Sequence, residues 1–555
     1  MQVHPLSSEL SVSPQLNLVD LAHVLSAGFR SIICNRPDGE ATDQPNFQDI
    51  AQEAGRLGIE AHYLPVQSGK ATDADAAMFA HLMQELPKPV MAYCKTGTRS
   101  ATLWALSQAA SRPFAQILEK TKAGGFDLSG FVRRIANGGK TPSDTHEQVH
   151  QVVIVGAGAA GLAVASSLLS RSPQLDIAVI DPADVHYYQP GWTMVGAGIF
   201  EAAETARTMA SLIPRGVHWV KANVVAFEPE KNAVLLEGGR VLRYDQLVVC
   251  PGLKLDWQGI EGLSETLGQN GVTSNYRFDL APYTWELVQQ LKGGKALFTQ
   301  PPMPIKCAGA PQKAMYLSSD HWLRNGVLKD IDVAFYNAGG VLFGVPDYVP
   351  ALMEYIQRYN IALNFGHTLT AVDGPGKKAT FTKTHADGTK ETVVSEFDML
   401  HVVPPQKSPD FIRVSPLADA AGWVDVDPGT MRHKTFSNVY GLGDAGNTTN
   451  AKTAAAARKQ APVVANNLLV GMGKLSGDCH YDGYGSCPLT VERGKIVLAE
   501  FLYGGKVAPS FPKWLIDGTR PSRAAWMLKE RVLPPLYWEG MLKGREWLAR
   551  PETVA

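Results

Sequence analysis

Cys94 is the first residue whose neighbours could make it reactive. It follows an expected strand, Pro89–Tyr93, and the helical run Ala101–Ser107 comes directly after its loop. A cysteine between a strand and a helix N-terminus meets backbone N–H groups and the positive helix end, which lower thiol pKa values and bind anions. Arg99 is expected to close this anion cradle with forked hydrogen bonds. Cys94 and Arg99 are therefore predicted catalytic residues, and a buried structural cysteine is the weaker interpretation.

The spacing between Cys94 and Arg99 helps to choose the reaction. Four residues separate them, whereas phosphatase loops of the Cys-x5-Arg kind have one more residue to enclose a tetrahedral phosphate. The shorter loop resembles that of rhodaneses, which hold a persulfide, so sulfur transfer is favoured. A phosphatase would need a general acid, for which Asp73 and Asp75 are candidates. The segment Thr72–Asp75 also has the pattern of a capped helix start, and capping is the favoured interpretation.

A second reactive cysteine, Cys307, is expected in the segment Pro304–Lys313. This segment follows the strand Lys295–Thr299, where a flavoenzyme with a nicotinamide site would carry its second glycine-rich loop. Only Gly309 is available there for a close approach of a pyrophosphate. We therefore expect NADH and NADPH to be poor reductants, and Cys307 to perform thiol chemistry on a small sulfur species.

One dinucleotide loop is intact. The strand Val152–Val155 leads into Gly156, Gly158 and Gly161, and a helix and a strand that ends at Asp181 follow. Strand, glycine loop, helix, strand and acid in this order form the βαβ fingerprint, with the acid placed for a ribose hydroxyl. A tight turn without a ligand rarely needs all three glycines, so nucleotide binding is predicted.

The same site is expected to receive residues from far along the chain. The segment Asn438–Asp444 is typical of an apolar strand ending at an acid, and an alanine-rich helix begins near Lys452. A second contact so distant favours FAD, because this long cofactor needs a partner for its ribityl and phosphate portion. Asp444 is predicted to make that contact, and the helix start near Lys452 to face the flavin. Val224 and Gly252 are further predicted cofactor contacts.

Length and composition limit the classes of protein that fit. The 555 residues exceed a usual single domain, 45% of them are apolar and 19% are charged, and the net charge of −1 gives no reason to expect nucleic acid. The six dispersed cysteines form neither a disulfide framework nor a Cys-x-x-Cys pair, so no metal site is predicted. The N-terminus lacks a signal-peptide pattern, and no apolar run could span a membrane. The chain is expected to be cytoplasmic.

A polar, turn-rich stretch at residues 136–149 has the composition of a linker. It separates a module at residues 1–135 from a second at residues 150–510, and residues 511–555 form a terminal segment. Strand and helix signals alternate in both modules, which predicts an α/β fold class.

Five motifs in the second module carry a family resemblance: His186–Thr193, Pro304–Lys313, Phe343–Val345, Gly441–Asp444 and Lys452–Ala456. Together they resemble sulfide:quinone oxidoreductases of the type shared with mitochondria, over almost all of residues 149–555. The resemblance implies two Rossmann-like domains, bound FAD, oxidation of sulfide by redox cysteines, and electron delivery to a membrane quinone. It also implies that Cys307 is the cysteine that carries sulfur beside the flavin.

The first module has a resemblance of its own. Its motifs Ser11–Gln15, Gly28–Ser31 and Asn35–Glu40, with the Cys94 loop, resemble the phosphatase-like domain found fused to or beside sulfide-oxidising enzymes. The resemblance implies the fold of dual-specificity phosphatases. The predicted architecture is thus a phosphatase-like domain, two Rossmann-like flavoprotein domains and a C-terminal amphipathic helical segment.

One position departs from the family pattern. The partner cysteine of the family follows the Gly-Asp motif directly, and this chain has Ala445 there. Either Cys307 works alone with the flavin, or Cys250, Cys487 or Cys94 replaces the missing thiol. A structural role is favoured for Cys250, within an apolar strand, and for Cys487, which belongs to a family stretch outside the redox pair.

Residues 511–555 are rich in aromatic and basic residues, as in Trp514–Leu515 and Leu533–Trp538. Segments too short to span, with Trp and Tyr beside Lys and Arg, suit a helix in the membrane interface and hence a peripheral membrane protein. The alternative is that these aromatics pack on the core of the chain itself or on a second subunit, as in a homodimer.

The predicted function joins both modules. The flavin module would oxidise sulfide or a low-molecular-weight persulfide through a Cys307 persulfide and reduce quinone, and the Cys94 module would transfer the sulfur. Two alternatives stay open: a phosphatase tethered to a flavoprotein, and a non-catalytic redox sensor in which Ala445 signals lost turnover.

Overall fold

The computed structural model describes residues 2–142 and 147–553, and the chain divides into two compact units. The first unit contains Met1–Val149, Ala222–Tyr244 and Asp410–Ala418. All remaining residues belong to the second. Sequence patterns did not indicate that the two later segments join the N-terminal module. Residues 143–146 of the expected linker lie outside the described residues.

The first unit is built on a sheet with the strand order β1-β2-β5-β3-β4, in which β2, β5, β3 and β4 are parallel and β1 is antiparallel to β2. Its strands are β1 (His4–Pro5), β2 (Leu10–Ser13), β3 (Ser31–Cys34), β4 (Glu60–Tyr63) and β5 (Val90–Tyr93). The expected strands before Cys34 and Cys94 are therefore present. Because parallel strands end at one edge of a sheet, Cys34 and Cys94 come close together there.

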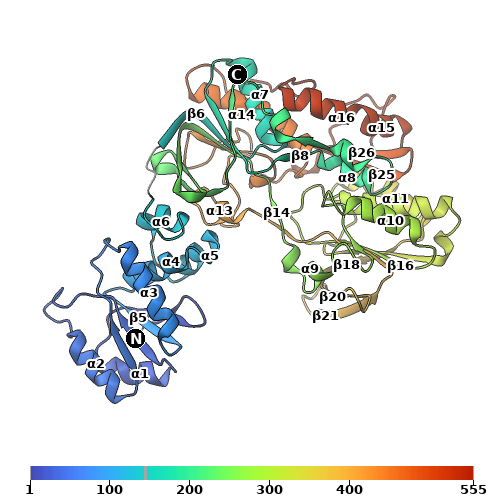
Figure 1. The fold of residues 1–555 in the computed structure, drawn as a ribbon. Coiled ribbons are helices and arrows are strands. Elements are labelled where there is room, and N and C mark those ends of the chain that lie inside the picture. Colours follow the sequence, from blue (N-terminus) through green and yellow to red (C-terminus); the bar gives the residue numbers. More distant parts are fainter. Residues whose placement is uncertain (1, 143–146, 554–555) are drawn as a thin grey trace. The chain divides into compact units, whose positions relative to one another are not determined.

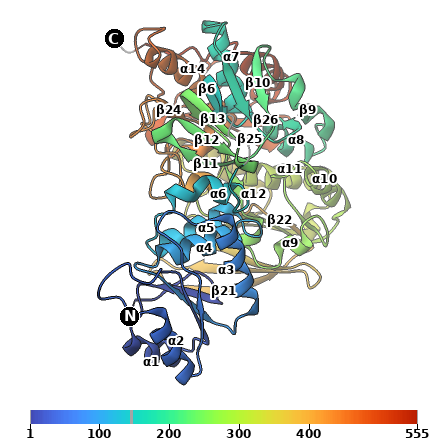
Figure 2. The same ribbon diagram turned by 60° about the vertical axis from the view of Figure 1, so that its left-hand side comes forward.

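Helices cover both faces of this sheet (Figures 1 and 2). Neighbouring Ile32 and Ile33 belong to different apolar clusters, since successive strand residues point to opposite faces. The apolar cluster around Ile32 includes residues of the first two helices of the unit, and the cluster around Ile33 includes residues of the third, fourth and fifth helices. These helices are α1 (Leu21–Ser26), α2 (Phe47–Arg56), α3 (Asp73–Glu85), α4 (Thr98–Gln108) and α5 (Phe114–Ala123).

The two later segments extend the first unit. Ala222–Tyr244 forms the antiparallel strands β11 (Val224–Glu228) and β12 (Ala233–Leu236) and the start of β13 (Val241–Val249). The guanidinium of Arg133, in α6 (Val132–Ala136), lies 3.2 Å from both Glu147 and Glu228. Arg413, in α13 (Asp410–Arg413), pairs with Glu119. These ion pairs join the segments to the N-terminal part of the unit.

The second unit begins with a parallel arrangement of strands. Strand β7 (Ile177–Ile180) lies between β6 (Glu147–Val155) and β10 (Val217–Val220), and β24 (Val439–Gly441) pairs in parallel with β13. Helices α7 (Ala159–Arg171) and α14 (Ala454–Gly471) pack on each other beside these strands. The strand–loop–helix–strand order predicted around the glycine loop is present.

A second parallel sheet follows, with the order β15-β22-β16-β17-β18. Its strands are β15 (Val272–Thr273), β16 (Gly294–Gln300), β17 (Ile331–Asn337), β18 (Ala362–Phe365) and β22 (Met399–His401). Helix α11 (Ala310–Arg324) runs directly after the Cys307 loop and buries Tyr316 and Trp322 against β16 and β17. The hairpin of β25 (Gly485–Glu492) and β26 (Lys495–Phe501) packs against α11.

The C-terminal residues form a nearly continuous helical run over 523–543. Trp526, Tyr537 and Trp538 are buried in the unit, and the Tyr537 hydroxyl lies 2.6 Å from Nε2 of His186. Trp514 and Trp547 stay exposed. The aromatics therefore divide between the core and the surface. Over the residues that the structure describes, no helix is both long and apolar enough to cross a bilayer.

Candidate active site

The Cys307 loop lies between β16 and α11. The backbone N–H of Cys307 donates to the carbonyl of Lys452 (2.8 Å), and its carbonyl accepts from Ala310 (2.7 Å). Cys307 has φ +48°, a left-handed conformation that non-glycine residues seldom adopt. Such strained backbone persists only where surrounding contacts hold it. Cys307 as a whole residue is partly buried.

Cys487, on strand β25, lies against this loop. It belongs to an apolar cluster against which Cys307 packs. A Cβ added to Gly309 would come 2.4 Å from Sγ of Cys487 and 2.6 Å from Leu489, so only glycine lets β25 approach the loop this closely. The side chain of Cys487 is 3% exposed. The structural role favoured from the sequence overlooked that this thiol faces Cys307.

Lys313, on the second turn of α11, supplies a positive charge to the pair. Its Nζ lies 3.3 Å from Sγ of Cys307, and its side chain is buried. The hydrogen bond from Cys487 and the ammonium of Lys313 hold the pKa of Cys307 well below its usual range, against the effect of burial. The hydrogen bond to Cys307 and burial raise the pKa of Cys487 well above its usual range. The ammonium of Lys313 therefore favours an anionic sulfur on Cys307.

A second buried amine comes from the C-terminal run. Lys529 is 4% exposed and donates to the carbonyl of Pro190 at 3.3 Å. Burial, with the nearby ammonium of Lys313, lowers the pKa of Lys529 to about 7. The thiolate of Cys307 and the thiol of Cys487 partly oppose this shift. Part of the predicted membrane segment therefore belongs to the thiol site.

The Gly-Asp loop lies beside the Cys307 loop. Asp444 is half-buried, and burial raises its pKa although Lys452 and Lys306 oppose this shift. The Nζ of Lys452 donates to the carbonyls of Asp444 (2.9 Å) and Gly446 (2.7 Å). Helix α14 begins at Ala454, and Thr453 caps it. Lys452 thus holds the loop in shape, and Ala445, the residue after Asp444, is buried.

The glycine loop has the geometry of a dinucleotide cradle. Gly156 has φ +102°, and a Cβ on Gly161 would lie 1.8 Å from the Gly156 carbonyl, so both positions require glycine. A Cβ on Gly158, at the N-cap of α7, would meet open space. The carboxylate of Asp181 accepts from the Ala157 N–H at 2.7 Å. Open space at a helix N-terminus, with an acid at the next strand end, fits a bound dinucleotide.

The other predicted cofactor contacts divide between the units. Gly252 has φ +79° and faces open space in the second unit. Val224 lies at the start of β11, in the first unit, and is buried. The Cys250 thiol donates to the Gly156 carbonyl at 3.7 Å, and burial raises its pKa. Cys250 is therefore a packing residue of the glycine loop, as favoured from the sequence.

The Cys94 loop differs from its prediction in one respect. Cys94 is buried, and its sulfur accepts a hydrogen bond from Gly97, which has φ +90° at the start of α4. The fork of Arg99 is not open: both of its terminal nitrogens donate to the carboxylate of Glu40, each at 2.8 Å. Burial alone would lower the pKa of Arg99, but Glu40 and the adjacent Cys94 outweigh burial and raise this pKa. An internal carboxylate closes the cradle that was expected to be free.

Asp73 and Asp75 serve the helix and its surroundings. Thr72 and Asp75 form a reciprocal capping box at the start of α3. Asp73 accepts from Arg134 at 2.7 Å and from the N–H of Thr141 at 3.0 Å. The favoured capping interpretation is confirmed for Asp75.

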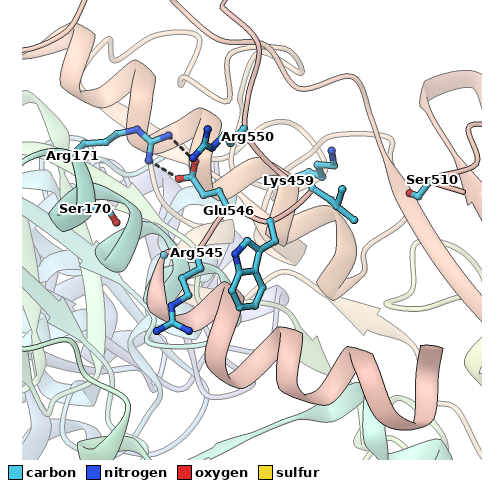
Figure 3. Close-up of a pocket in the computed structure, with 10 residues that line it drawn as sticks. Ser170, Arg171, Lys459, Ser510, Arg545, Glu546 and Arg550 are labelled. Carbon is cyan, nitrogen blue, oxygen red and sulfur yellow. Dashed lines mark hydrogen bonds and ion pairs between the residues drawn. The ribbon is translucent and has the colours of Figure 1, made fainter. Parts of the chain in front are cut away.

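A surface cavity of about 790 Å³ lies near the C-terminus of the chain (Figure 3). Arg171 and Glu546 form an ion pair in it, with an N–O distance of 2.9 Å. Lys459, Arg545 and Arg550 also line it, beside Trp547 and Leu548. No predicted site residue lies there, so this basic cavity is separate from the thiol site.

Sequence reasoning missed three charged residues. Lys313 stood within the segment quoted for Cys307, six residues later, and its place on α11 was the available signal. Lys529 and Glu40 carried no such signal, because long stretches of chain separate them from Cys307 and Arg99.

Comparisons with known families agree with this geometry. Residues 150–284 match the family described as pyridine nucleotide-disulphide oxidoreductase, which defines the class of the flavin-type module. Residues 2–111 match the phosphatase-like domain of beta-lactamase hydrolase-like protein. Over 135 residues the chain is 34% identical to a beta-lactamase hydrolase-like protein of Agrobacterium fabrum, covering 24% of this chain and 31% of that protein.

Two curated relatives define the family. The mitochondrial sulfide:quinone oxidoreductase of Dictyostelium discoideum is 42% identical over 73% of this chain and 88% of its own length. The mitochondrial sulfide:quinone oxidoreductase of Mus musculus is 37% identical over 72% of this chain and 88% of its own length. The chain belongs to the sulfide:quinone oxidoreductase family, with an added phosphatase-like domain.

Solved structures support the fold alone. The sulfide:quinone oxidoreductase of Aquifex aeolicus has a TM-score of 0.59 at 18% identity, over 71% of this chain and 92% of that one. A chain of the Tetrahymena thermophila mitochondrial ATP synthase assembly has a TM-score of 0.63 at 22% identity. The match covers 73% of this chain and 98% of that chain. Both share the arrangement of the second unit in its broad outline.

Proposed function

We propose that this chain uses FAD to oxidise sulfide, or a related persulfide, and passes the electrons to quinone. The observation that carries the proposal is the position of Cys307: its sulfur lies 3.3 Å from Nζ of Lys313, and its backbone bonds to the loop that follows Asp444. The curated relatives are named sulfide:quinone oxidoreductases, and the glycine loop fits a dinucleotide.

The residues have distinct roles in this proposal. The nucleotide portion would be held by Gly156, Gly158, Gly161, Asp181 and Gly252, and the ribityl portion by Asp444. Bound FAD would supply a two-electron acceptor. Cys307 would bind the sulfur as a persulfide, and Lys313 would keep the sulfur atom anionic.

Anaerobic sulfide titration of the purified flavoprotein tests this proposal. Sulfide is expected to bleach the flavin absorbance, and a soluble quinone to restore it. NADH and NADPH are the control reductants, and poor bleaching by both is expected. If sulfide bleached nothing, or if quinone reduction did not persist over many turnovers, the redox-sensor alternative would replace the enzyme.

For the N-terminal domain we propose sulfur transfer, with Cys94 as carrier and Arg99 as anion contact. The four-residue spacing supports it. The match to a phosphatase-like family favours phosphatase activity as the second candidate. Thiosulfate with cyanide is compared with an aryl phosphate on the intact chain, and Cys94→Ser is the blank. Hydrolysis of the aryl phosphate without thiocyanate formation would decide for the phosphatase.

We further propose peripheral attachment to a membrane from the cytoplasmic side. Trp514 is exposed, and the exposed Trp547 and Leu548 line the cavity of Figure 3 together with its basic residues. Aromatic and basic groups together favour the membrane interface. Flotation with vesicles containing anionic lipid is the test, and sedimentation without lipid shows whether a homodimer forms instead. Loss of vesicle binding is expected for Trp547→Ala with Leu548→Ala.

A further inference from the structure

Arg36 is a second buried cation beside the Cys94 loop. It follows strand β3, whereas Arg99 lies on the first turn of α4, after strand β5. Nε of Arg36 donates to Oε2 of Glu40 at 3.0 Å, and this oxygen also accepts from Nη2 of Arg99 at 2.8 Å. Nη1 of Arg99 donates to the other oxygen at 2.8 Å. Two guanidinium groups from neighbouring strand ends therefore hold a single carboxylate.

The charges of this cluster do not balance. Within residues 2–142 and 147–553, Glu40 supplies the only carboxylate at ion-pair distance from either guanidinium group. The other partners are neutral: the amide oxygen of Gln15 accepts from Arg36 at 3.0 Å, and the carbonyl of Val66 accepts from Arg99 at 2.9 Å. A dianion would neutralise both guanidinium groups, which one carboxylate does not. A tetrahedral oxyanion would also offer each group its own oxygens, whereas both now share Oε2.

The two arginines are fixed, whereas the carboxylate can leave. The side chains of Arg36 and Arg99 are 6% and 10% exposed, and that of Glu40 is 28% exposed. Glu40 lies in the turn-rich stretch between β3 and α2, directly after Gly39, whose φ of +77° suits glycine. Rotation of the Glu40 side chain into water leaves both arginines with their neutral partners. The cluster thus contains two fixed cations and one displaceable anion.

The sulfur of Cys94 belongs to the same site. It accepts from the N–H of Gly97 at 3.2 Å, and its charge interacts with that of Arg99. Helix α4 begins at Thr98, so its positive end faces this loop. An anion that replaced Glu40 on Arg99 would share this cation with the Cys94 sulfur.

We propose that Arg36 and Arg99 form one binding site for a doubly charged tetrahedral oxyanion, which displaces the Glu40 carboxylate. This inference rests on the proposed sulfur transfer, for which thiosulfate is the oxyanion. A phosphate monoester has the same shape and charge, and it is the corresponding ligand of the phosphatase candidate. Arg36 is the specificity-determining residue, because it doubles the positive charge that the ligand meets.

Protection of Cys94 from alkylation tests binding without turnover. The intact chain is treated with iodoacetamide while sodium sulfate replaces sodium chloride at constant ionic strength, and mass spectrometry of the digest gives the alkylated fraction of Cys94. Sulfate is expected to slow this reaction in the wild type. The monoanion methanesulfonate is expected to slow it much less at the same concentration. Equal protection by both anions, or protection by neither, would overturn the proposal.

Variants identify the residues that bind sulfate. Arg36→Gln should raise the sulfate concentration for half-protection about tenfold or more, the loss expected for a hydrogen bond to a charged group. Arg36→Lys should keep part of the effect. Arg56→Gln, on the exposed surface of α2, is the matched control and should change nothing. An unchanged half-protection concentration in Arg36→Gln would overturn the proposal.

Glu40→Gln guards against a trivial loss of folding. This variant should lower the sulfate concentration for half-protection several-fold, because an amide competes less well than a carboxylate for the two guanidinium groups. Misfolding could weaken sulfate binding but could not strengthen it. A higher half-protection concentration in Glu40→Gln would show that the carboxylate organises the site and is not displaced.

Turnover separates the two sources of the oxyanion. In Arg36→Gln, the KM for thiosulfate in sulfur transfer to cyanide is expected to rise, and the KM for the monoanionic donor benzenethiosulfonate to change little. Sulfate protection that depends on Arg36 in a chain that hydrolyses an aryl phosphate and transfers no sulfur would refute the proposed transfer and keep the two-arginine site. Sulfur transfer with an unchanged KM for thiosulfate in Arg36→Gln would do the reverse.

Discussion

The Cys94 and Cys307 loops both place a cysteine just before a helix, yet their surroundings differ. Cys94 is buried, and the arginine beside it is paired with the Glu40 carboxylate through both arms of its fork. Cys307 is half-exposed, and its charged neighbour is an ammonium that bonds to the sulfur itself. The comparison teaches that the same strand–loop–helix position gives a cysteine different electrostatic surroundings, depending on whether the nearest cation pairs with the sulfur or with a carboxylate.

The largest effect is expected from Cys307→Ser. This variant should retain FAD, because the glycine loop and Asp444 hold the cofactor without the thiol. It should lose sulfide-driven bleaching of the flavin, measured by anaerobic absorbance titration. Full bleaching would show that Cys307 is not needed for the reaction with sulfide, and the contrast drawn between the Cys307 and Cys94 loops would be wrong.

Lys313→Gln should weaken the thiolate of Cys307. A hydrogen bond to a charged group contributes about 1.5–3 kcal/mol, which corresponds to a rise of about one to two units in the Cys307 pKa. Alkylation by iodoacetamide, followed across pH, should then require a higher pH. In the wild type the depressed pKa keeps Cys307 reactive until the pH falls through that low value. Lys313→Arg, which keeps the charge, is the control, and an unchanged profile in Lys313→Gln would contradict the role of the ammonium.

Glu40→Gln should open the cradle beside Cys94. Hydrogen bonds from Arg99 hold the pKa of Glu40 below its usual range, so the carboxylate competes with substrate anions at neutral pH. Removing its charge should lower the KM for thiosulfate several-fold. In the wild type, the KM should also fall as the pH drops through the Glu40 pKa, because the carboxylate then becomes neutral. Glu53→Gln, which changes an exposed ion pair, is the matched control. A higher KM in Glu40→Gln would mean that Glu40 assists binding instead.

The smallest effect is expected on quinone reduction when Cys94 is replaced. Cys94→Ser is expected to leave sulfide-dependent quinone reduction largely intact while abolishing persulfide transfer to cyanide or glutathione. Each loop has its own cation and its own hydrogen bonds. A collapse of both activities would show that Cys94 also takes part in quinone reduction.

Features that depend on residues close together in the sequence could be predicted, whereas contacts between residues far apart in the sequence could not. The glycine loop and the strands before Cys94 and Asp181 were predicted, because each depends on neighbours within a few residues. Cys307 was predicted from its motif and the family resemblance, and its role in the reaction stays a prediction. Glu40 and Lys529 were not predicted, since only tertiary packing brings them to Arg99 and Cys307.

Cys487 shows a second limit. Its apolar strand marks it as buried, and alternation along the strand tells which residues share a face. Neither pattern says which loop that face meets. The only local trace of the contact was Gly309, whose missing side chain is explained by a sulfur that lies far away in the sequence.

The first unit is assembled from three separate stretches of chain, the last of which ends at Ala418. During synthesis, the sheet made by residues up to Tyr93 leaves the ribosome early, whereas β11, β12 and α13 follow much later. Domains commonly fold in the order in which they are made. Here the unit synthesised first is completed only after most of the other has emerged, so the maturation of the two is interleaved.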